Sequence, residues 1–457
     1  MPVRIEVDPR SPRCQAALRR AAVALLVLLA LAGTAAAAPL TLDEAVRLAL
    51  DTSEDVRAAR ARRAQADAGV TAARAALLPG LTLTGSYTRR AREVTRNVGG
   101  EDVTIQSANA LGANLTVATT LFDGRAYPLL RAARRQRDAA TLDEQERRRQ
   151  IAFGAAAAFL TALGHERVVD AAVRRQEFAV ARQRDAAARV DARLVSTNDR
   201  TQADLEVATA SRELAGARAA LAVAYAELAW WIGGDVAGPL VEPDRLHATA
   251  SAPQPDPAGL ADLAHRQRPD LAATRLRVDV ARELAAEPGR RAWPTLDLIG
   301  QYRLTNEAGL SGHNTDWLVT LSATWELWDG GRRGADARAR ALDVELAHLD
   351  VSAADRRARA ELAAARARLD GARAALPPAE QVAAAAAQHA DEVAVLYAQG
   401  LARALDVVDA GARRYDAEVA VARARVELAA AWLELGLATG APPLATPTSP
   451  SPDGDSP

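Results

Sequence analysis

EDVRAARARRAQADAGVTAARAALLPGLTLTGSY, residues Glu54 to Tyr87, decides the fold of this chain because a second copy follows later in the sequence. The stretch PDLAATRLRVDVARELAAEPGRRAWPTLDLIGQY, residues Pro269 to Tyr302, aligns with it without a gap, so that Pro79 meets Pro294. Each copy begins as a helical pattern, reaches a proline and continues as alternating apolar and polar residues. This change of period predicts a helix that ends before a strand begins.

Further matches follow in the same order along the chain. The segment Phe122 to Gly124 (FDG) matches Trp328 to Gly330 (WDG), and a later helical pattern ending at Gly233 matches one ending at Gly440. The two late patterns share heptad-spaced apolar residues, which are Leu214, Leu221 and Leu228 in the first and Val421, Leu428 and Leu435 in the second. Such internal similarity predicts one structural unit of about 200 residues that is duplicated, with a coiled-coil seam at the heptad positions.

Each unit is predicted to begin with a helix and two strands. In the first unit the helix runs from Leu42 to Leu78, and its start is marked by a capping box of Thr41 and Glu44. Residues 81–88 and 111–121 then alternate as strands, and the second unit repeats this pattern with two sets of apolar residues. The sets are Leu296, Leu298, Tyr302 and Leu304, and Trp317, Val319, Leu321, Trp325 and Leu327.

Long helical patterns complete each unit. They run from Gly124 to about Ala192 and from Gly330 to about Gln399, lengths that indicate a coiled coil or an unusual assembly. The chain turns at residues 193–196 or 400–404 and returns as a shorter helix. The first helix and the returning helix of a unit are equally long, so each long helix can pack against two half-length helices stacked end to end.

These patterns divide the chain into five segments. Residues 1–38 resemble an export signal, because arginines precede an apolar run shorter than the ~20 residues of a spanning helix; an uncleaved anchor is the alternative. Residues 39–233 form the first structural repeat, 234–258 a proline-rich equatorial linker, and 259–440 the second repeat. Residues 441–457 have the composition of a disordered tail.

Composition excludes several classes of function. A formal net charge of -1 gives no basic face for nucleic acid. The only cysteine, Cys14, lies in the predicted signal, so we expect no disulfide, thiolate site or lipid anchor on a mature N-terminal cysteine. The six histidines show no metal-ligand spacing, and no nucleophile motif or phosphate loop is present. We therefore expect no catalytic residues, no metal, no cofactor and no enzyme activity.

The strands predict a membrane sheet. Their apolar faces are bounded by aromatic residues that are typical of a membrane girdle, namely Phe122, Trp293, Trp317, Trp325 and Trp328. A sheet in lipid must close, because unpaired edge amides are costly there. Four strands per chain are too few for a water-filled barrel, whereas two chains supply eight and three supply twelve. A soluble sheet packed on itself or on helices is the alternative.

In its order of elements, the chain resembles the TolC-like outer-membrane efflux protein family. The resemblance rests on LTLDEAVRLAL (Leu40 to Leu50), on the proline-to-strand junctions, on FDG and WDGG, and on the duplication. It implies a mostly α-helical protein with a membrane β-barrel, in which a homotrimer forms twelve strands continued by a long α-helical coiled-coil barrel. It also implies an outer-membrane exit duct that extends into the periplasm and serves a tripartite efflux pump or type I secretion system, with a periplasmic adaptor and an inner-membrane transporter as partners.

Two acidic residues gain a predicted role from this resemblance. Asp406 and Asp409 lie three residues apart on one helix face, at positions where family members narrow the lumen. Threefold symmetry would make each a ring of carboxylates that a multivalent cation could block. The resemblance also implies a latch between Tyr397 and Asp199, and an adaptor-facing tip formed by Leu194, Val195, Ser196, Gly400, Leu401 and Ala402.

Two departures from the family pattern concern the tips. Arg193 stands where the family has a glycine, a departure that concerns the geometry of the first turn. Ala402 stands where the family has an arginine, with Arg403 next to it, so a second latch is left open. The alternative function is a periplasmic coiled-coil adaptor or scaffold of an export system, which would also be exported and rich in long helices. The sequence does not identify the cargo, because a water-filled duct selects little.

Overall fold

The computed structural model describes residues 39–236, 239–243, 250–252, 257–307 and 313–441. The predicted signal (1–38), most of the predicted tail (441–457) and parts of the linker (234–258) lie outside these residues. The chain forms two compact units. Unit 1 contains the described parts of Met1–Ala49, Ala155–Thr249 and Pro378–Val426, and unit 2 contains those of Leu50–Gly154, Ala250–Pro377 and Glu427–Pro457.

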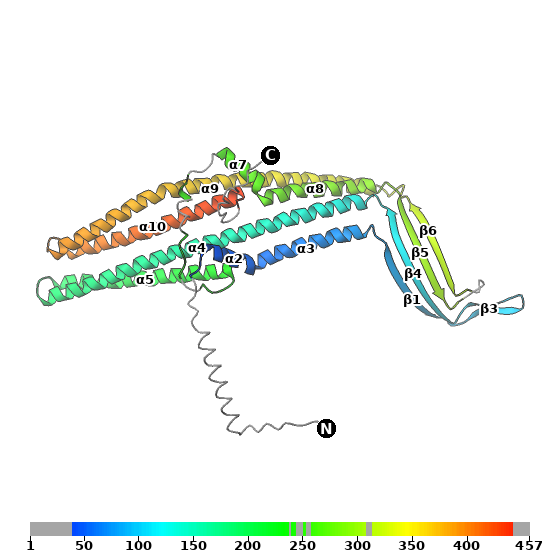
Figure 1. Ribbon diagram of the computed structural model, residues 1–457, viewed down its shortest axis with the longest axis horizontal. Coiled ribbons are helices and arrows are strands. Elements are labelled where there is room, and N and C mark those ends of the chain that lie inside the picture. The colour runs from blue at the N-terminus through cyan, green and yellow to red at the C-terminus, as the bar shows by residue number, and fades with distance from the viewer. Residues whose placement is uncertain (1–38, 237–238, 244–249, 253–256, 308–312, 442–457) are drawn as a thin grey trace, which may run out of the picture. The chain divides into compact units, whose positions relative to one another are not determined.

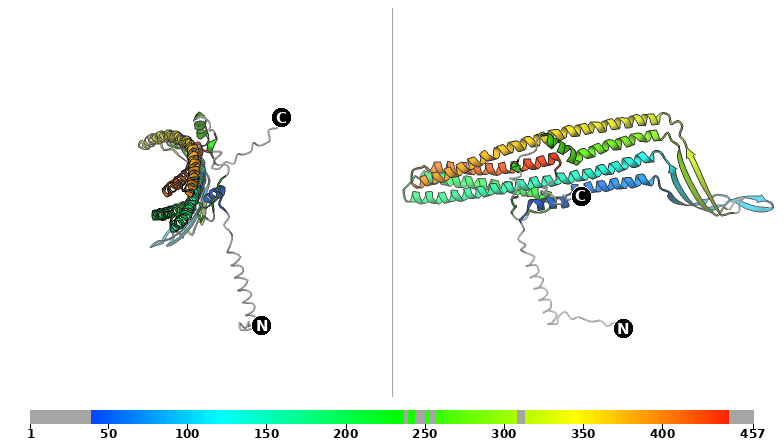
Figure 2. Two further views of the ribbon diagram at one scale, coloured as in Figure 1. Left: turned by 90° about the vertical axis from the view of Figure 1, so that its left-hand side faces the viewer. Right: turned by 45° about the horizontal axis from the view of Figure 1, so that its top comes forward.

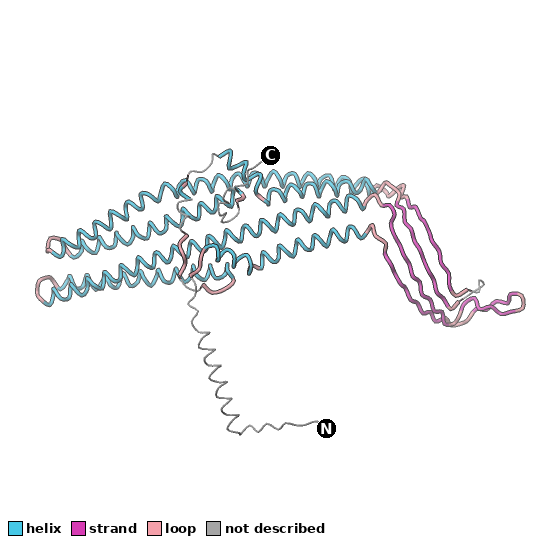
Figure 3. Tube along the Cα trace, in the orientation of Figure 1, coloured by secondary structure: helices cyan, strands magenta, loops and turns pink. Residues whose placement is uncertain are grey.

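Helices dominate the structure, and Figures 1 and 3 show them with the strands. The helices are α2 (Leu42–Thr52), α3 (Glu54–Ala75), α4 (Ala126–Asp191), α5 (Thr197–Ile232), α7 (Pro257–Gln267), α8 (Pro269–Arg290), α9 (Arg332–Ala398) and α10 (Ala404–Thr439). The strands are β1 (Gly80–Arg89), β2 (Val94–Val98), β3 (Glu101–Gln106), β4 (Asn109–Phe122), β5 (Thr295–Thr305) and β6 (Thr315–Thr324). This mostly helical fold with a small sheet was predicted, and the two copies match in size: α4 has 66 residues and α9 has 67, while α5 and α10 each have 36.

The first helix of each copy is interrupted, which the sequence pattern did not predict. α2 ends at Thr52 and α3 begins at Glu54, with Ser53 between them accepting a hydrogen bond from the backbone N–H of Val56 at 3.4 Å. In the second copy Arg268 separates α7 from α8, and a proline occupies the start of α8. Both solutions relieve backbone groups at a helix start, one through a serine cap and the other through proline, which lacks the N–H. The continuous helix predicted over Leu42 to Leu78 is therefore wrong.

The four long strands form one antiparallel sheet in the order β1-β4-β5-β6. They lie side by side in Figures 1 and 2. β6 ends at Thr324, so Trp325 and Leu327 are not in the strand as predicted. The physical reason is that β5 begins only at Thr295, directly after Pro294, and offers no partner further on. A separate hairpin of β2 and β3 in the β1–β4 connection was not predicted.

Alanine and leucine side chains fill the helix interfaces within each unit. In unit 1, Leu214 packs with Ala172 and Ala217. In unit 2, a larger cluster joins α9 to the end of α10 through Leu362, Leu369, Leu428 and Leu435. Of the six predicted seam positions, Leu214, Leu228, Leu428 and Leu435 are buried, whereas Leu221 and Val421 are half-buried. The heptad reading of the late helices is thus confirmed at four of its positions.

None of the helices in the described ranges is both long and apolar enough to cross a membrane.

Candidate functional site: the helical tips and the sheet

Two tight turns close the helical hairpins of unit 1. After α4, Arg193 adopts a left-handed backbone with φ 57°, and after α9, Gly400 does the same with φ 76°. In both turns the residue in this conformation donates its N–H to the carbonyl three positions back, at 2.9 Å to Val190 and 3.0 Å to Tyr397. The next N–H, of Leu194 or Leu401, bonds five positions back at 2.9 and 2.8 Å. This is the Schellman arrangement, which ends a helix sharply.

The predicted tip residues lie in and next to these turns. Leu194 and Leu401 are 75% and 72% exposed. Ser196 begins α5 as its N-cap by accepting the backbone N–H of Asn198 at 3.1 Å. Each hairpin therefore offers an exposed leucine next to a rigid turn.

Asp406 and Asp409 lie in the first turns of α10, and each has an arginine partner. Asp406 accepts hydrogen bonds from the backbone N–H of Arg403 at 2.9 Å and from its guanidinium at 3.0 Å. These side-chain and backbone bonds hold the pKa of Asp406 below its usual value. Asp409 forms an ion pair with Arg413 at 2.6 Å. Within one chain each of the two aspartates thus has an arginine partner close in sequence.

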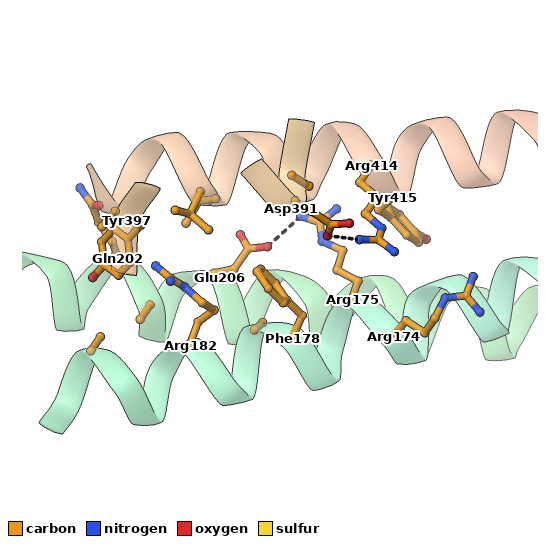
Figure 4. Close-up of a pocket in the computed structure, with 18 of the residues that line it drawn as sticks. Arg174, Arg175, Phe178, Arg182, Gln202, Glu206, Asp391, Tyr397, Arg414 and Tyr415 are labelled. Atoms are coloured by element: carbon orange, nitrogen blue, oxygen red, sulfur yellow. Dashed lines mark hydrogen bonds and ion pairs between the residues drawn. The ribbon is translucent and has the colours of Figure 1, made fainter. Parts of the chain in front are cut away.

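A cavity of about 200 Å³ lies between the two helical hairpins of unit 1. Figure 4 shows that its walls come from both hairpins, with Phe178 and Arg182 on α4 facing Tyr397 and Tyr415 on the other pair. Tyr397 and Asp199 both line this cavity, as the predicted latch requires. In the part of the chain that the structure describes, however, no hydrogen bond joins their side chains.

Ion pairs lie between the hairpins and within one of them, and they crowd one wall of the cavity. Arg174 on α4 reaches Glu418 on α10 at 2.6 Å. Arg175 pairs with Glu206 at 3.2 Å and with Glu213 at 2.9 Å, both on α5. Burial raises the pKa of Glu206, and the charge of Arg175 opposes that rise. The wall is therefore a charged network whose carboxylates are only partly hydrated.

Sequence reasoning missed three arginines that face this cavity or its edge. Arg175, Arg182 and Arg189 recur every seven residues on α4. Arg175 lies over the ring of Tyr415 at 5.0 Å from its centroid. Arg182 and Arg189 lie over the ring of Tyr397 at 3.9 and 4.9 Å. The heptad spacing was visible in the sequence, but the partner tyrosines are more than 200 positions away and only the fold brings them near.

In unit 2, strand pairing sorts the sheet into two chemically different faces. One row across all four strands is apolar and consists of Leu83, Leu115, Tyr302 and Trp317. The adjacent row, which points to the other face, is polar and consists of Thr84, Asn114, Arg303 and Asp316. The apolar row is open, with Leu83 73% and Trp317 72% exposed. The sheet therefore presents a broad uncovered apolar face.

Aromatic side chains occupy both ends of the apolar face. Trp317 and Tyr302 are paired toward the hairpin end, while Phe122 and Trp293 stack at the helix end with centroids 6.0 Å apart. The register shifts between Thr120 and Phe122, so that Phe122 pairs with the apolar Leu296. Without this bulge, Phe122 would point to the polar face. Trp325 donates its indole N–H to the carbonyl of Ala292 at 2.9 Å, and Trp328 is exposed.

Both outer strands of the sheet have one open edge. β1 pairs with β4 and β6 pairs with β5, and in the sheet order neither has a second neighbour. All ten residues of β1 are exposed, as are nine of ten in β6. Exposed edges of this length invite pairing with another chain.

No cluster of three or more metal-binding side chains is found among the described residues.

The sequence matches the outer membrane efflux protein family over residues 45–234 and 260–441. No curated protein matches the chain closely enough to count as a relative.

Several solved structures share the fold. One, from work on the conformational changes that accompany folding and transmembrane channel formation in CusC, has a TM-score of 0.74 and 16% identity, and covers 89% of this chain and 93% of that one. The Campylobacter jejuni CmeC outer membrane channel has a TM-score of 0.72 and 17% identity, covering 87% and 85%. The Vibrio cholerae outer membrane protein VceC has a TM-score of 0.71 and 19% identity, covering 88% and 97%.

Proposed function

The chain belongs to the outer membrane efflux protein family, and on that premise we propose that it is the outer-membrane exit duct of a tripartite efflux pump or type I secretion system. Three copies assemble, and their sheets close into one twelve-stranded barrel in the outer membrane. The helices continue the duct into the periplasm. The duct is passive, and a periplasmic adaptor and an inner-membrane transporter supply cargo and energy.

The open sheet is the observation that carries this proposal. It exposes a continuous apolar face between two aromatic ends and leaves both edges unpaired. Lipid would cover the apolar face. Pairing of β6 in one chain with β1 in the next chain would satisfy the unpaired backbone groups at the sheet edges. The polar row through Thr84, Asn114 and Arg303 would then line a water-filled interior. Twelve strands would give a barrel wide enough for such an interior.

A cysteine cross-linking experiment tests the assembly. Thr84→Cys on β1 is combined in turn with Asp316→Cys, Leu318→Cys, Thr320→Cys and Ser322→Cys on β6, because the stagger between copies is set by barrel closure. At least one combination should give covalent trimers in outer-membrane fractions, since a disulfide needs Cα atoms within about 7 Å. The single-cysteine variants are the controls. Monomers from every combination would rule out the shared barrel.

At the tip we propose that Asp406 and Asp409 form two rings around the lumen. Each carboxylate has a neighbouring arginine, so negative and positive groups would alternate around each ring, which would not be uniformly negative. Asp406→Ala with Asp409→Ala should abolish cation selectivity and multivalent cation block in single-channel recordings. Arg403→Ala should strengthen both, because it leaves Asp406 unpaired. Recordings that do not change in either variant would contradict a lumen position.

The exposed tip leucines support a docking role for the turns. We propose that Leu194 and Leu401, with Val195, Ser196, Gly400 and Ala402, contact the periplasmic adaptor. Leu194→Glu with Leu401→Glu should abolish adaptor binding in pull-down experiments while leaving the trimer intact.

A further inference from the structure

The tyrosine of the predicted latch is contacted by arginines through its ring face. Arg182 lies 3.9 Å and Arg189 4.9 Å from the ring centroid of Tyr397. Both arginines belong to α4, whereas Tyr397 ends α9. One heptad toward the start of α4, Arg175 lies over Tyr415 of α10 in the same way. A column of three guanidinium groups on one hairpin therefore faces two aromatic rings on the other.

The ring of Tyr397 is fixed to its own hairpin. It is only 4% exposed and packs in a cluster with Val393, Val407 and Ala410. Packing of this kind restricts the ring, so the arginines of α4 can stack on it without a further loss of side-chain freedom for the tyrosine. The described residues include no hydrogen-bond partner for its hydroxyl, although Asp199 lines the same cavity.

Two of the three arginines are also held by their own hairpin. Arg175 is held by Glu206 and Glu213, and Arg189 by Asp185 at 3.1 Å. Arg182 is different, because among the described residues it forms no ion pair with a carboxylate. Its guanidinium lies over the ring of Tyr397 instead. The closest guanidinium is thus the one that no carboxylate neutralises. An unpaired cation over an aromatic face is the arrangement in which this attraction is strongest.

We propose that stacking of Arg182 and Arg189 on the ring of Tyr397 holds the two helical hairpins of unit 1 together and so keeps the periplasmic end of the duct closed. The contact uses the face of the ring and not its hydroxyl. Arg175 on Tyr415 is a second contact of the same kind further along the hairpins. This inference rests on the proposed function as a duct and specifies how that duct is regulated.

A contact through the ring face and a latch through the hydroxyl predict different effects of substitutions at Tyr397. If the hydroxyl mattered, Tyr397→Phe and Tyr397→Leu would open the tip equally. If the face matters, phenylalanine keeps the contact and leucine loses it, because a leucine side chain has no aromatic face. Lysine at position 182 would keep the charge but lose the flat stacking of a guanidinium.

Closed-state conductance of purified trimers in planar bilayers is the first measurement. Tyr397→Leu and Arg182→Gln should each raise it roughly tenfold, the size expected for loss of a contact between a buried ring and a half-buried guanidinium. Tyr397→Phe should leave it within about twofold of the wild type, and Arg182→Lys should fall between. Arg184→Gln is the matched control, because Arg184 is an exposed arginine on the same helix. Equal opening by Tyr397→Phe and Tyr397→Leu, or no difference between Arg182→Gln and Arg184→Gln, would overturn the proposal.

Hydrogen exchange separates failure of this contact from failure of the duct. In the full-length protein in detergent, amides in the last two turns of α9 should lose protection in Arg182→Gln and Tyr397→Leu but not in Tyr397→Phe. This readout does not require conductance. If the wild type forms no conducting trimer, the duct is wrong and the exchange pattern still decides the contact; unchanged exchange in all variants would refute the contact itself.

Discussion

Arg193 holds a backbone conformation that costs a residue with a Cβ about 1–2 kcal/mol. The Schellman hydrogen bonds around it require that conformation, and the equivalent turn of the second copy uses Gly400. The backbone at Arg193 is therefore strained, and the hydrogen bonds of the turn offset that strain.

Replacing this arginine with glycine should stabilise the first tip. Arg193→Gly is expected to gain about 1 kcal/mol in the last turn of α4, because glycine removes the left-handed penalty. Slower hydrogen exchange at the amides of position 193 and of Leu194, the two donors of the motif, would report it. Gly400→Ala is the reciprocal variant and should speed exchange at Leu401. Faster exchange in Arg193→Gly would mean that the side chain contributes more than the backbone strain costs.

Two buried arginines secure the end of α10 in unit 2. Arg149 donates to the carbonyl of Leu437 at 2.6 Å and pairs with Glu146 at 2.8 Å. Arg268 donates to the carbonyl of Ala438 at 3.4 Å and pairs with Asp270 and Glu361. Cations at a helix C-terminus oppose the negative end of its dipole and satisfy unpaired carbonyls. Gly440 then leaves the helix so close to Gln267 that a Cβ there would lie 2.7 Å from its carbonyl carbon.

Acid should weaken this arrangement in a defined pH range. Burial acts to raise the pKa of Asp270, but the hydrogen bonds and charge of Arg268 outweigh it, so the pKa lies below the usual value. A depressed carboxylate pKa stabilises the fold above the unfolded pKa of about 3.9 and loses that effect as pH falls through the folded value. Asp270→Asn should therefore cost about 1 kcal/mol at neutral pH, discounted because Arg268 keeps Glu361.

The measurement is the thermal midpoint by circular dichroism for the wild type and Asp270→Asn. The difference should persist down to about pH 4 and shrink below it. A difference that grows as pH falls would show that the pKa is raised instead.

At the scale of one element, the side chains of β1 alternate between the apolar and the polar face of the sheet. Leu83 belongs to the apolar row and Thr84 to the polar row, although both are exposed in the single chain. Exposure alone therefore does not distinguish them, and only the side of the sheet does.

A matched pair of arginine substitutions should separate the two faces. Leu83→Arg places a charge where we expect hydrocarbon and should cost about 2–4 kcal/mol near the midplane, whereas Thr84→Arg should cost little. The yield of heat-modifiable trimer in outer-membrane fractions checks both. Equal yields would contradict the assignment of the apolar face to lipid.

The whole molecule carries its positive charge on arginine alone, since the sequence contains no lysine. Arginine stays protonated beyond about pH 12, whereas lysine loses its charge near 10.4. The ion pairs within each unit, such as Arg174 with Glu418 in unit 1 and Arg268 with Asp270 in unit 2, should therefore survive strong alkali.

Helix content should accordingly stay constant up to about pH 11. Circular dichroism during an alkaline titration of the purified protein measures it. A transition centred near pH 10 would indicate that tyrosine ionisation, and not the cation, limits alkaline stability.

At the same scale, membership in the efflux family does not favour the alternative of a periplasmic adaptor or scaffold. The two repeats of the chain have also diverged in the residues at their helix starts and turns. A serine cap in one helix start corresponds to a proline in the other, and a turn arginine corresponds to a turn glycine. Only the connection between β1 and β4 contains the extra β2–β3 hairpin among the described residues.

The sequence by itself determined the duplication, the element order, the long helices and the two faces of each strand, because these depend on periodicity and on local signals such as proline and glycine. The predicted helix over Leu42 to Leu78 and its counterpart in the second repeat missed the breaks at Ser53 and Arg268, although a serine cap and Pro269 mark these helix starts locally. Only the tertiary structure decided that strands from the two repeats of one chain align Leu83 with Trp317 across the sheet, and that Arg182 meets Tyr397. These contacts join residues far apart in the chain, and no local pattern encodes which distant partner a side chain will meet.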